Sequence, residues 1–95
     1  MKYPHYKVLK STIEDAFSSN KHILALELDN FSEELDFEIT GVAQSLFESD
    51  VPNIKLKKQL SLWFAASFPE QDWNENMFTD TVIKIKTNLK KIENV

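Results

Sequence analysis

Apolar residues recur every three or four positions in four segments of the chain, the spacing that one face of an α-helix requires. The segments cover about residues 4–19, 31–49, 53–67 and 79–92. The pattern therefore predicts four amphipathic helices joined by short loops. Their apolar stripes are formed by Tyr6, Leu9, Ile13, Ala16 and Phe17; by Phe31, Leu35, Ile39, Val42, Ala43, Leu46 and Phe47; by Leu56, Leu60, Trp63 and Phe64; and by Val82, Ile85, Leu89 and Ile92.

Residues that form turns are scarce, with one Gly and three Pro in 95 residues. An all-β domain needs such residues at every turn, so their scarcity favours helices. A chain of this length forms one domain, which we take to span residues 1–95. We expect an all-α fold, a small bundle of four to five short helices.

Residues 22–40 permit a second interpretation. The stretches 23–28 (ILALEL) and 35–40 (LDFEIT) alternate between apolar and polar residues and could pair as a β-hairpin. The helical phase continues through Phe47 whereas the strand phase does not, which favours a helix over 31–49. On that interpretation Asn30 caps the helix and Glu33 closes a capping box. An α+β fold with a hairpin at 22–40 remains the alternative.

Negative charge is concentrated in the middle of a chain whose net charge is −4. Residues 22–54 contain no Lys or Arg, and like charges one helical turn apart repel each other. We interpret this stretch as a surface kept for a basic partner, with a solubilising surface as the other interpretation. Its eight acidic residues are Glu27, Asp29, Glu33, Glu34, Asp36, Glu38, Glu48 and Asp50.

Motifs of catalysis and of metal or cofactor binding are missing from the sequence. It has no Cys, no Gly-rich phosphate loop, no Ser elbow and no His pair at metal-ligand spacing. We therefore expect neither an enzyme nor a cofactor nor a metal. The chain also lacks Arg, and its acidic balance argues against a nucleic-acid partner.

The two tryptophans differ in their sequence surroundings. Trp63 stands next to Phe64 in an apolar segment, and we assign both to the core. Trp73 is surrounded by polar residues, so it is either an exposed anchor for a partner or a lid that folds back over the core.

No apolar run is long enough to cross a bilayer, the longest being residues 62–66. The first residues do not lead into the apolar core of a signal peptide. We therefore expect no membrane partner and a cytoplasmic location.

Small size, lack of Cys, net acidity and an unpaired acidic stretch make the chain similar, in general character, to small acidic inhibitors such as bacterial immunity proteins. The resemblance implies a non-enzymatic protein-binding module that neutralises a basic partner, for example a nuclease toxin domain. The eight acidic residues and Trp73 would form its binding surface. The alternative is a regulatory or structural helical subunit that assembles through an aromatic surface.

Overall fold

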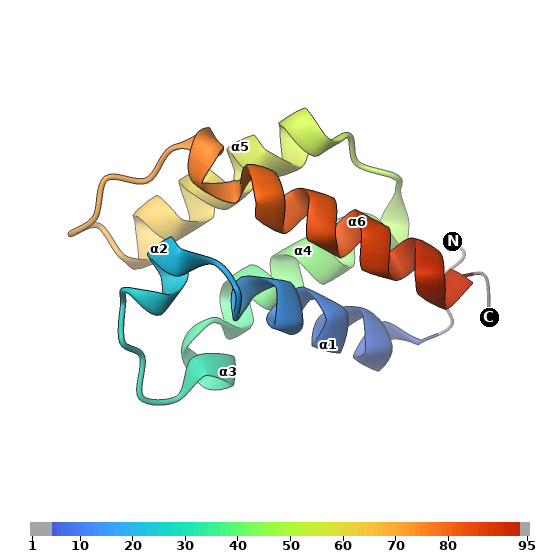
Figure 1. The fold of residues 1–95 in the computed structure, drawn as a ribbon, viewed down its shortest axis with the longest axis horizontal. Coiled ribbons are helices and arrows are strands. Elements are labelled where there is room, and N and C mark those ends of the chain that lie inside the picture. The colour runs from blue at the N-terminus through green and yellow to red at the C-terminus, as the bar shows by residue number, and fades with distance from the viewer. Residues whose placement is uncertain (1–4, 94–95) are drawn as a thin grey trace.

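The computed structural model describes residues 5–93, with only the backbone described at position 93. These residues form six α-helices and one 3₁₀ turn and contain no strand, which confirms the all-α prediction and shows the hairpin at 22–40 to be wrong (Figure 1). The elements are α1 (Tyr6–Phe17), α2 (Lys21–Leu24), α3 (Phe31–Glu34), α4 (Asp36–Glu48), α5 (Asn53–Ser67), η1 (Glu75–Phe78) and α6 (Thr79–Glu93).

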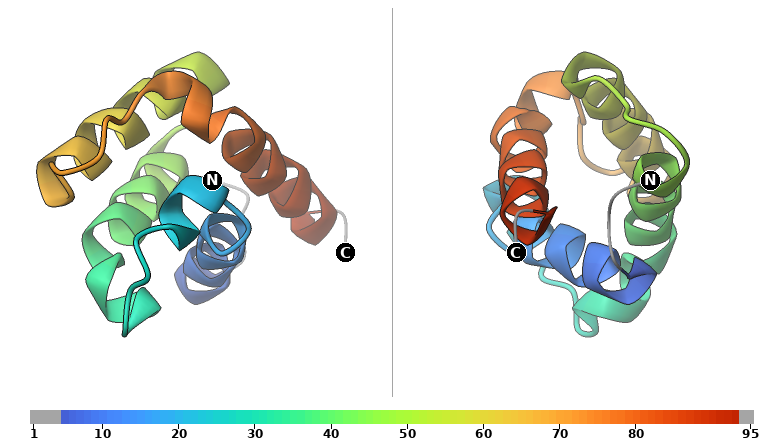
Figure 2. Two further views of the ribbon diagram at one scale, coloured as in Figure 1. Left: turned by 60° about the vertical axis from the view of Figure 1, so that its left-hand side comes forward. Right: turned by 90° about the vertical axis from the view of Figure 1, so that its right-hand side faces the viewer.

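The four long helices surround one core, and each packs against the next in the ring α1–α4–α5–α6–α1 (Figure 2). Most of the predicted stripe residues face inward, because an amphipathic helix gains free energy by burying its apolar side. Tyr6 and Phe47 are exceptions: both are exposed, and their rings contact each other with centroids 5.8 Å apart. Phe17 of α1 and Phe64 of α5 meet across the centre with ring centroids 5.6 Å apart. The buried stripe residues on the four helices include Leu9 and Ile13; Ile39, Val42 and Leu46; Leu56 and Leu60; and Val82, Ile85 and Leu89.

The predicted single helix over 31–49 is divided at Leu35. The backbone of Leu35 (φ −103°, ψ 9°) departs from helical geometry while its side chain is fully buried, so the core contact is kept at the expense of helix continuity. The predicted capping box does not form. In the four-residue α3, the carboxylate of Glu34, instead of that of Glu33, accepts the hydrogen bond from the backbone N–H of Asn30 at 3.0 Å.

Asn20 ties the short helix α2 to the start of α6. Its side-chain oxygen caps α2 by accepting hydrogen bonds from the backbone N–H groups of His22 and Ile23. Its amide nitrogen donates to the carbonyl of Met77 at 2.9 Å and to the hydroxyl of Thr81 at 2.8 Å. Because the amide nitrogen and the side-chain oxygen both make two hydrogen bonds, this buried side chain is fully satisfied.

Candidate protein-binding surfaces

The eight acidic residues of 22–54 do not form one continuous surface. Asp36 pairs with Lys10 of α1 at 3.5 Å, and Asp50 pairs with Lys86 of α6 at 3.4 Å. Both lysines are distant in sequence, so a stretch without basic neighbours along the chain still acquires them through folding.

Glu38 is the largest departure from the predicted acidic surface, because its side chain is 0 % exposed. It lies between α4 and α5, where the hydroxyl of Ser67 donates a hydrogen bond to Oε2 at 2.5 Å and Oε1 has no partner among the described residues. Burial raises the pKa of Glu38 above its ordinary value, although the hydrogen bond from Ser67 acts in the opposite direction. Glu38 lies on α4 next to the buried Ile39, and its carboxyl group faces α5.

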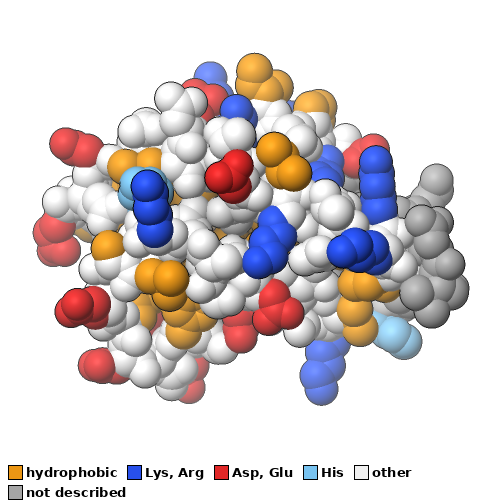
Figure 3. Space-filling model, viewed as in Figure 1, with side chains coloured by type: hydrophobic (Ala, Val, Ile, Leu, Met, Phe, Trp, Pro, Cys, Tyr) orange, Lys and Arg blue, Asp and Glu red, His pale blue; other side chains and the backbone are white. Residues whose placement is uncertain are grey.

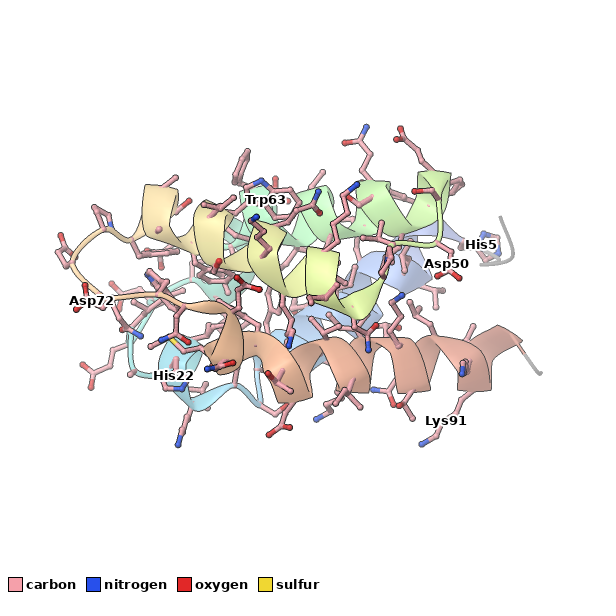
Figure 4. The ribbon with its side chains drawn as sticks, turned by 90° about the horizontal axis from the view of Figure 1, so that it is seen from above. His5, His22, Asp50, Trp63, Asp72 and Lys91 are labelled. Carbon is pink, nitrogen blue, oxygen red and sulfur yellow. The ribbon has the colours of Figure 1, made fainter. Side chains whose placement is uncertain are left out.

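The remaining acidic residues separate into two groups at opposite ends of the molecule. Glu48 and Asp50 lie where α4 leads into α5, at the end opposite Asp72 (Figure 4). The other group lies towards the end of the molecule that holds both the α2–α3 loop and the α5–η1 loop (Figure 1), and Figure 3 shows carboxylates along this side with most lysines elsewhere. We call this group the acidic end; its exposed members are Glu27, Asp29, Glu33, Glu34, Glu70, Asp72 and Glu75.

The acidic end contains three residues that the sequence analysis did not include. Glu70, Asp72 and Glu75 follow α5 in the chain and reach this end only through the fold. Neither of the two ion pairs among the described residues involves a carboxylate of the acidic end. The acidic end therefore has seven exposed acidic side chains, and none of them has a lysine partner in the described part of the chain.

Trp73 is partly buried and packs over the core, as in the lid interpretation. Its ring stacks on Phe78 with centroids 5.7 Å apart and contacts Phe64 at 4.9 Å. Its indole N–H donates a hydrogen bond to the carbonyl of Phe68 at 2.9 Å. The polar loop around Trp73 thus holds one large side chain over the buried aromatic cluster.

Trp63, assigned to the core from sequence, is only partly buried and lies against α4. Its ring meets Phe37 edge to face, with centroids 6.2 Å apart and an interplanar angle of 74°, and Phe37 is 62 % exposed. Beneath the indole is Gly41, where a Cβ atom would come within 3.0 Å of two ring carbons. We call this region the α4–α5 seam; it comprises Phe37, Glu38 and Gly41 on α4 and Gln59, Trp63 and Ser67 on α5.

Two side chains inside the seam each have a buried oxygen atom without a hydrogen-bond partner among the described residues. These atoms are Oε1 of Glu38 and the side-chain oxygen of Gln59. Gln59, Trp63 and Ser67 are spaced by four positions and therefore share one face of α5. Buried polar atoms without partners reduce stability and call for an explanation beyond packing.

A shallow pocket of about 260 Å³ lies between α1, α3 and α4. Three of its four charged groups have partners, since Lys10 pairs with Asp36 and the hydroxyl of Ser32 donates to Glu14 at 2.8 Å; the fourth, Lys7, forms no ion pair with a described residue. No group of three His, Asp or Glu side chains that could hold a metal occurs among residues 5–93. The pocket therefore offers no argument for a catalytic site.

Comparison with known proteins finds no family model that matches the chain, and no curated protein or solved structure with significant similarity to it. In the part of the chain that the structure describes, every helix is too short or too polar to span a bilayer.

Proposed function

We propose that this protein is a non-enzymatic binding module that docks a basic partner protein through its acidic end. The observation that supports the proposal is that two segments distant in sequence, residues 27–34 and 70–75, place seven exposed carboxylates towards one end of the molecule, none of them paired with a lysine in the described part of the chain. Such a surface accelerates association with a positively charged partner and disfavours acidic ones.

An inhibitor of the immunity-protein type, acting in the cytoplasm on a basic nuclease toxin, is the specific form we propose for this activity. The carboxylates would pair with the Lys and Arg side chains with which such an enzyme holds phosphate groups. Compared with the stretch inferred from sequence, the proposed surface loses Asp36, Glu38, Glu48 and Asp50 and gains Glu70, Asp72 and Glu75. Trp73 is no longer part of it, because its indole is held in the core.

Selection from a random peptide display library tests the proposal. The native protein should enrich peptides rich in Lys and Arg, and their affinity should fall as salt is raised from about 50 to 500 mM, because salt screens exposed charges. The triple variant Glu33→Lys, Glu70→Lys, Asp72→Lys should bind these peptides much more weakly. A matched control is Glu48→Lys, which reverses an exposed carboxylate at the opposite end and should have little effect.

Enrichment of neutral or acidic peptides, or unchanged binding by the folded triple variant, would refute the proposal. Salt-insensitive binding would favour the second candidate, a regulatory or structural subunit that assembles through an aromatic surface. The specific observation behind that candidate is the exposed Phe37 against Trp63.

A further inference from the structure

The α4–α5 seam contains a glycine that only the position of Trp63 explains. Gly41 is the single Gly of the chain and lies within α4, where Gly weakens a helix relative to Ala. Its backbone is in no conformation that demands Gly, since no Gly has positive φ. Instead, a Cβ atom would press on the edge of the indole, with contacts of 3.0 Å to two of its carbons. Gly41 thus allows Trp63 to lie against the backbone of α4.

This placement leaves an aromatic pair at the surface instead of enclosing it. Phe37 exposes 62 % of its area and lies directly against Trp63, so the two aromatic side chains form a pair at the surface, unlike a single exposed apolar residue. Trp63 is partly exposed, and its indole N–H, unlike that of Trp73, forms no hydrogen bond with a described residue. Aromatic faces and a free donor are therefore available to a binding partner (Figure 4).

The charged residues that lie nearest to the pair in the sequence are acidic. Four carboxylates lie within four positions of Phe37, and residues 59–70, which include Trp63, contain no lysine. The four carboxylates are those of Glu33, Glu34, Asp36 and Glu38. Among these four, Asp36 alone forms an ion pair with a described residue. Glu38 is enclosed in the seam, and its Oε1 has no partner among the described residues, so the seam holds a buried oxygen that lacks a hydrogen-bond donor.

We propose that the Phe37–Trp63 pair holds an Arg or Lys side chain of the partner, bound against the aromatic rings, with the unpartnered oxygen of Glu38 in the same seam. The inference rests on the proposed function and deepens it, since it names the partner's anchoring side chain. Cations are attracted to the faces of Trp and Phe rings, and the neighbouring carboxylates add to the attraction. The exposed aromatic pair selects a cation, and the adjoining acidic end attracts the rest of a basic segment.

Affinity measurements with defined peptides test this inference. The probe is a short peptide of alternating Gly and Arg, compared with Gly-Glu and Gly-Leu peptides of the same length by calorimetry at low salt. The Gly-Arg peptide should bind the native protein best. Replacing Phe37 by Leu keeps an apolar side chain but removes the ring, and should weaken Gly-Arg binding by about two- to fivefold. The control Ile83→Ala alters an exposed apolar residue on α6 and should leave affinity unchanged.

The possible results separate this inference from the proposed function. If Phe37→Leu binds the Gly-Arg peptide like the native protein while the acidic-end triple variant does not, the aromatic pair is not the anchor and the proposed function stands. If the native protein binds no Gly-Arg peptide, or binds the Gly-Glu peptide equally well, both are wrong. Should Phe37→Leu fail to fold, Trp63→Leu gives the same comparison, with the same expected loss and the same contradicting result.

Discussion

The two tryptophans of this protein have opposite surroundings. The indole of Trp73 donates to the carbonyl of Phe68, and its ring packs on Phe64 and Phe78. At Trp63 the ring lies over a glycine beside an exposed Phe37, and buried oxygens of two neighbouring side chains have no partner among the described residues. The first arrangement stabilises the fold, whereas the second reduces stability. This contrast is the reason why we assign Trp63, and not Trp73, to the proposed binding surface.

The largest expected difference in stability between the two regions appears when one phenylalanine in each is replaced by alanine. Phe64 is fully buried between Phe17, Trp73 and Phe78, so Phe64→Ala should lower the free energy of unfolding by about 3–5 kcal/mol. Phe37→Ala should lower it by about 1 kcal/mol or less, because the ring is mostly exposed. Urea unfolding followed by circular dichroism measures both. Equal losses in the two variants would remove the distinction between the regions.

Hydrogen bonding gives the next contrast. Asn20→Ala removes the cap of α2 and leaves the carbonyl of Met77 and the hydroxyl of Thr81 without their partner, so the free energy of unfolding should fall by about 2–3 kcal/mol. Asn30 precedes α3 but makes no side-chain capping bond, so Asn30→Ala should change stability by about 0.5 kcal/mol or less. The same urea titrations decide the matter; a loss at Asn30 as large as at Asn20 would contradict this account of the hydrogen bonds.

In the seam, removal of a polar group should raise stability. Glu38→Met replaces a buried carboxyl group by an apolar side chain of similar length, while the exposed Ser67 can turn to water. We expect the free energy of unfolding to increase by about 1–2 kcal/mol at neutral pH. Glu33→Met, on the exposed α3, is the control and should be nearly neutral.

The gain should also depend on pH. Because burial raises the pKa of Glu38 above 4.5 in the folded state, the folded protein binds this proton more tightly than the unfolded chain. Glu38 therefore contributes to the stability of the native protein at pH values below its unfolded-state pKa. This contribution is lost as the pH rises through the folded-state pKa of Glu38. The advantage of Glu38→Met over the native protein should grow in the same direction. A constant advantage, or a destabilised variant, would show that Glu38 is not a strained carboxyl group.

The smallest change in stability is expected at Gly41. Gly41→Ala gains about 0.5–1 kcal/mol from helix propensity but must push the indole of Trp63 away, so the two effects should largely cancel. The displaced ring should show red-shifted fluorescence as it becomes more exposed. Thr40→Ala, one position earlier in α4, should leave the emission unchanged. A clear rise in stability with unaltered fluorescence would mean that Trp63 does not depend on the glycine.

Helical periodicity predicted the core well, because burial of an apolar stripe depends on local spacing: Leu9, Leu46, Leu60 and Leu89 are all enclosed. The division of 31–49 at Leu35 was not predicted, since it depends on how the core receives that side chain. The isolated Gly41 within a helical pattern was the one available signal that a large side chain packs against α4.

Site residues were harder to place because their roles depend on contacts between helices. Within the predicted acidic surface, Asp36 and Asp50 form ion pairs with lysines of α1 and α6, and Glu38 is buried at the interface with α5. Charge counted along the chain cannot show such pairings. It also cannot show that a loop after α5 brings its carboxylates to the same end as the α2–α3 loop.

Two-dimensional NMR of the tryptophan indole N–H groups tests most directly whether Trp63 belongs to a binding surface and Trp73 to the core. The two indoles give separate signals, and the peptide of alternating Gly and Arg is added stepwise to the native protein. We predict that the Trp63 signal moves progressively to saturation while the Trp73 signal, protected by its hydrogen bond to Phe68, stays in place. A titration that moves Trp73 and leaves Trp63 unchanged, or that moves neither, would contradict the account.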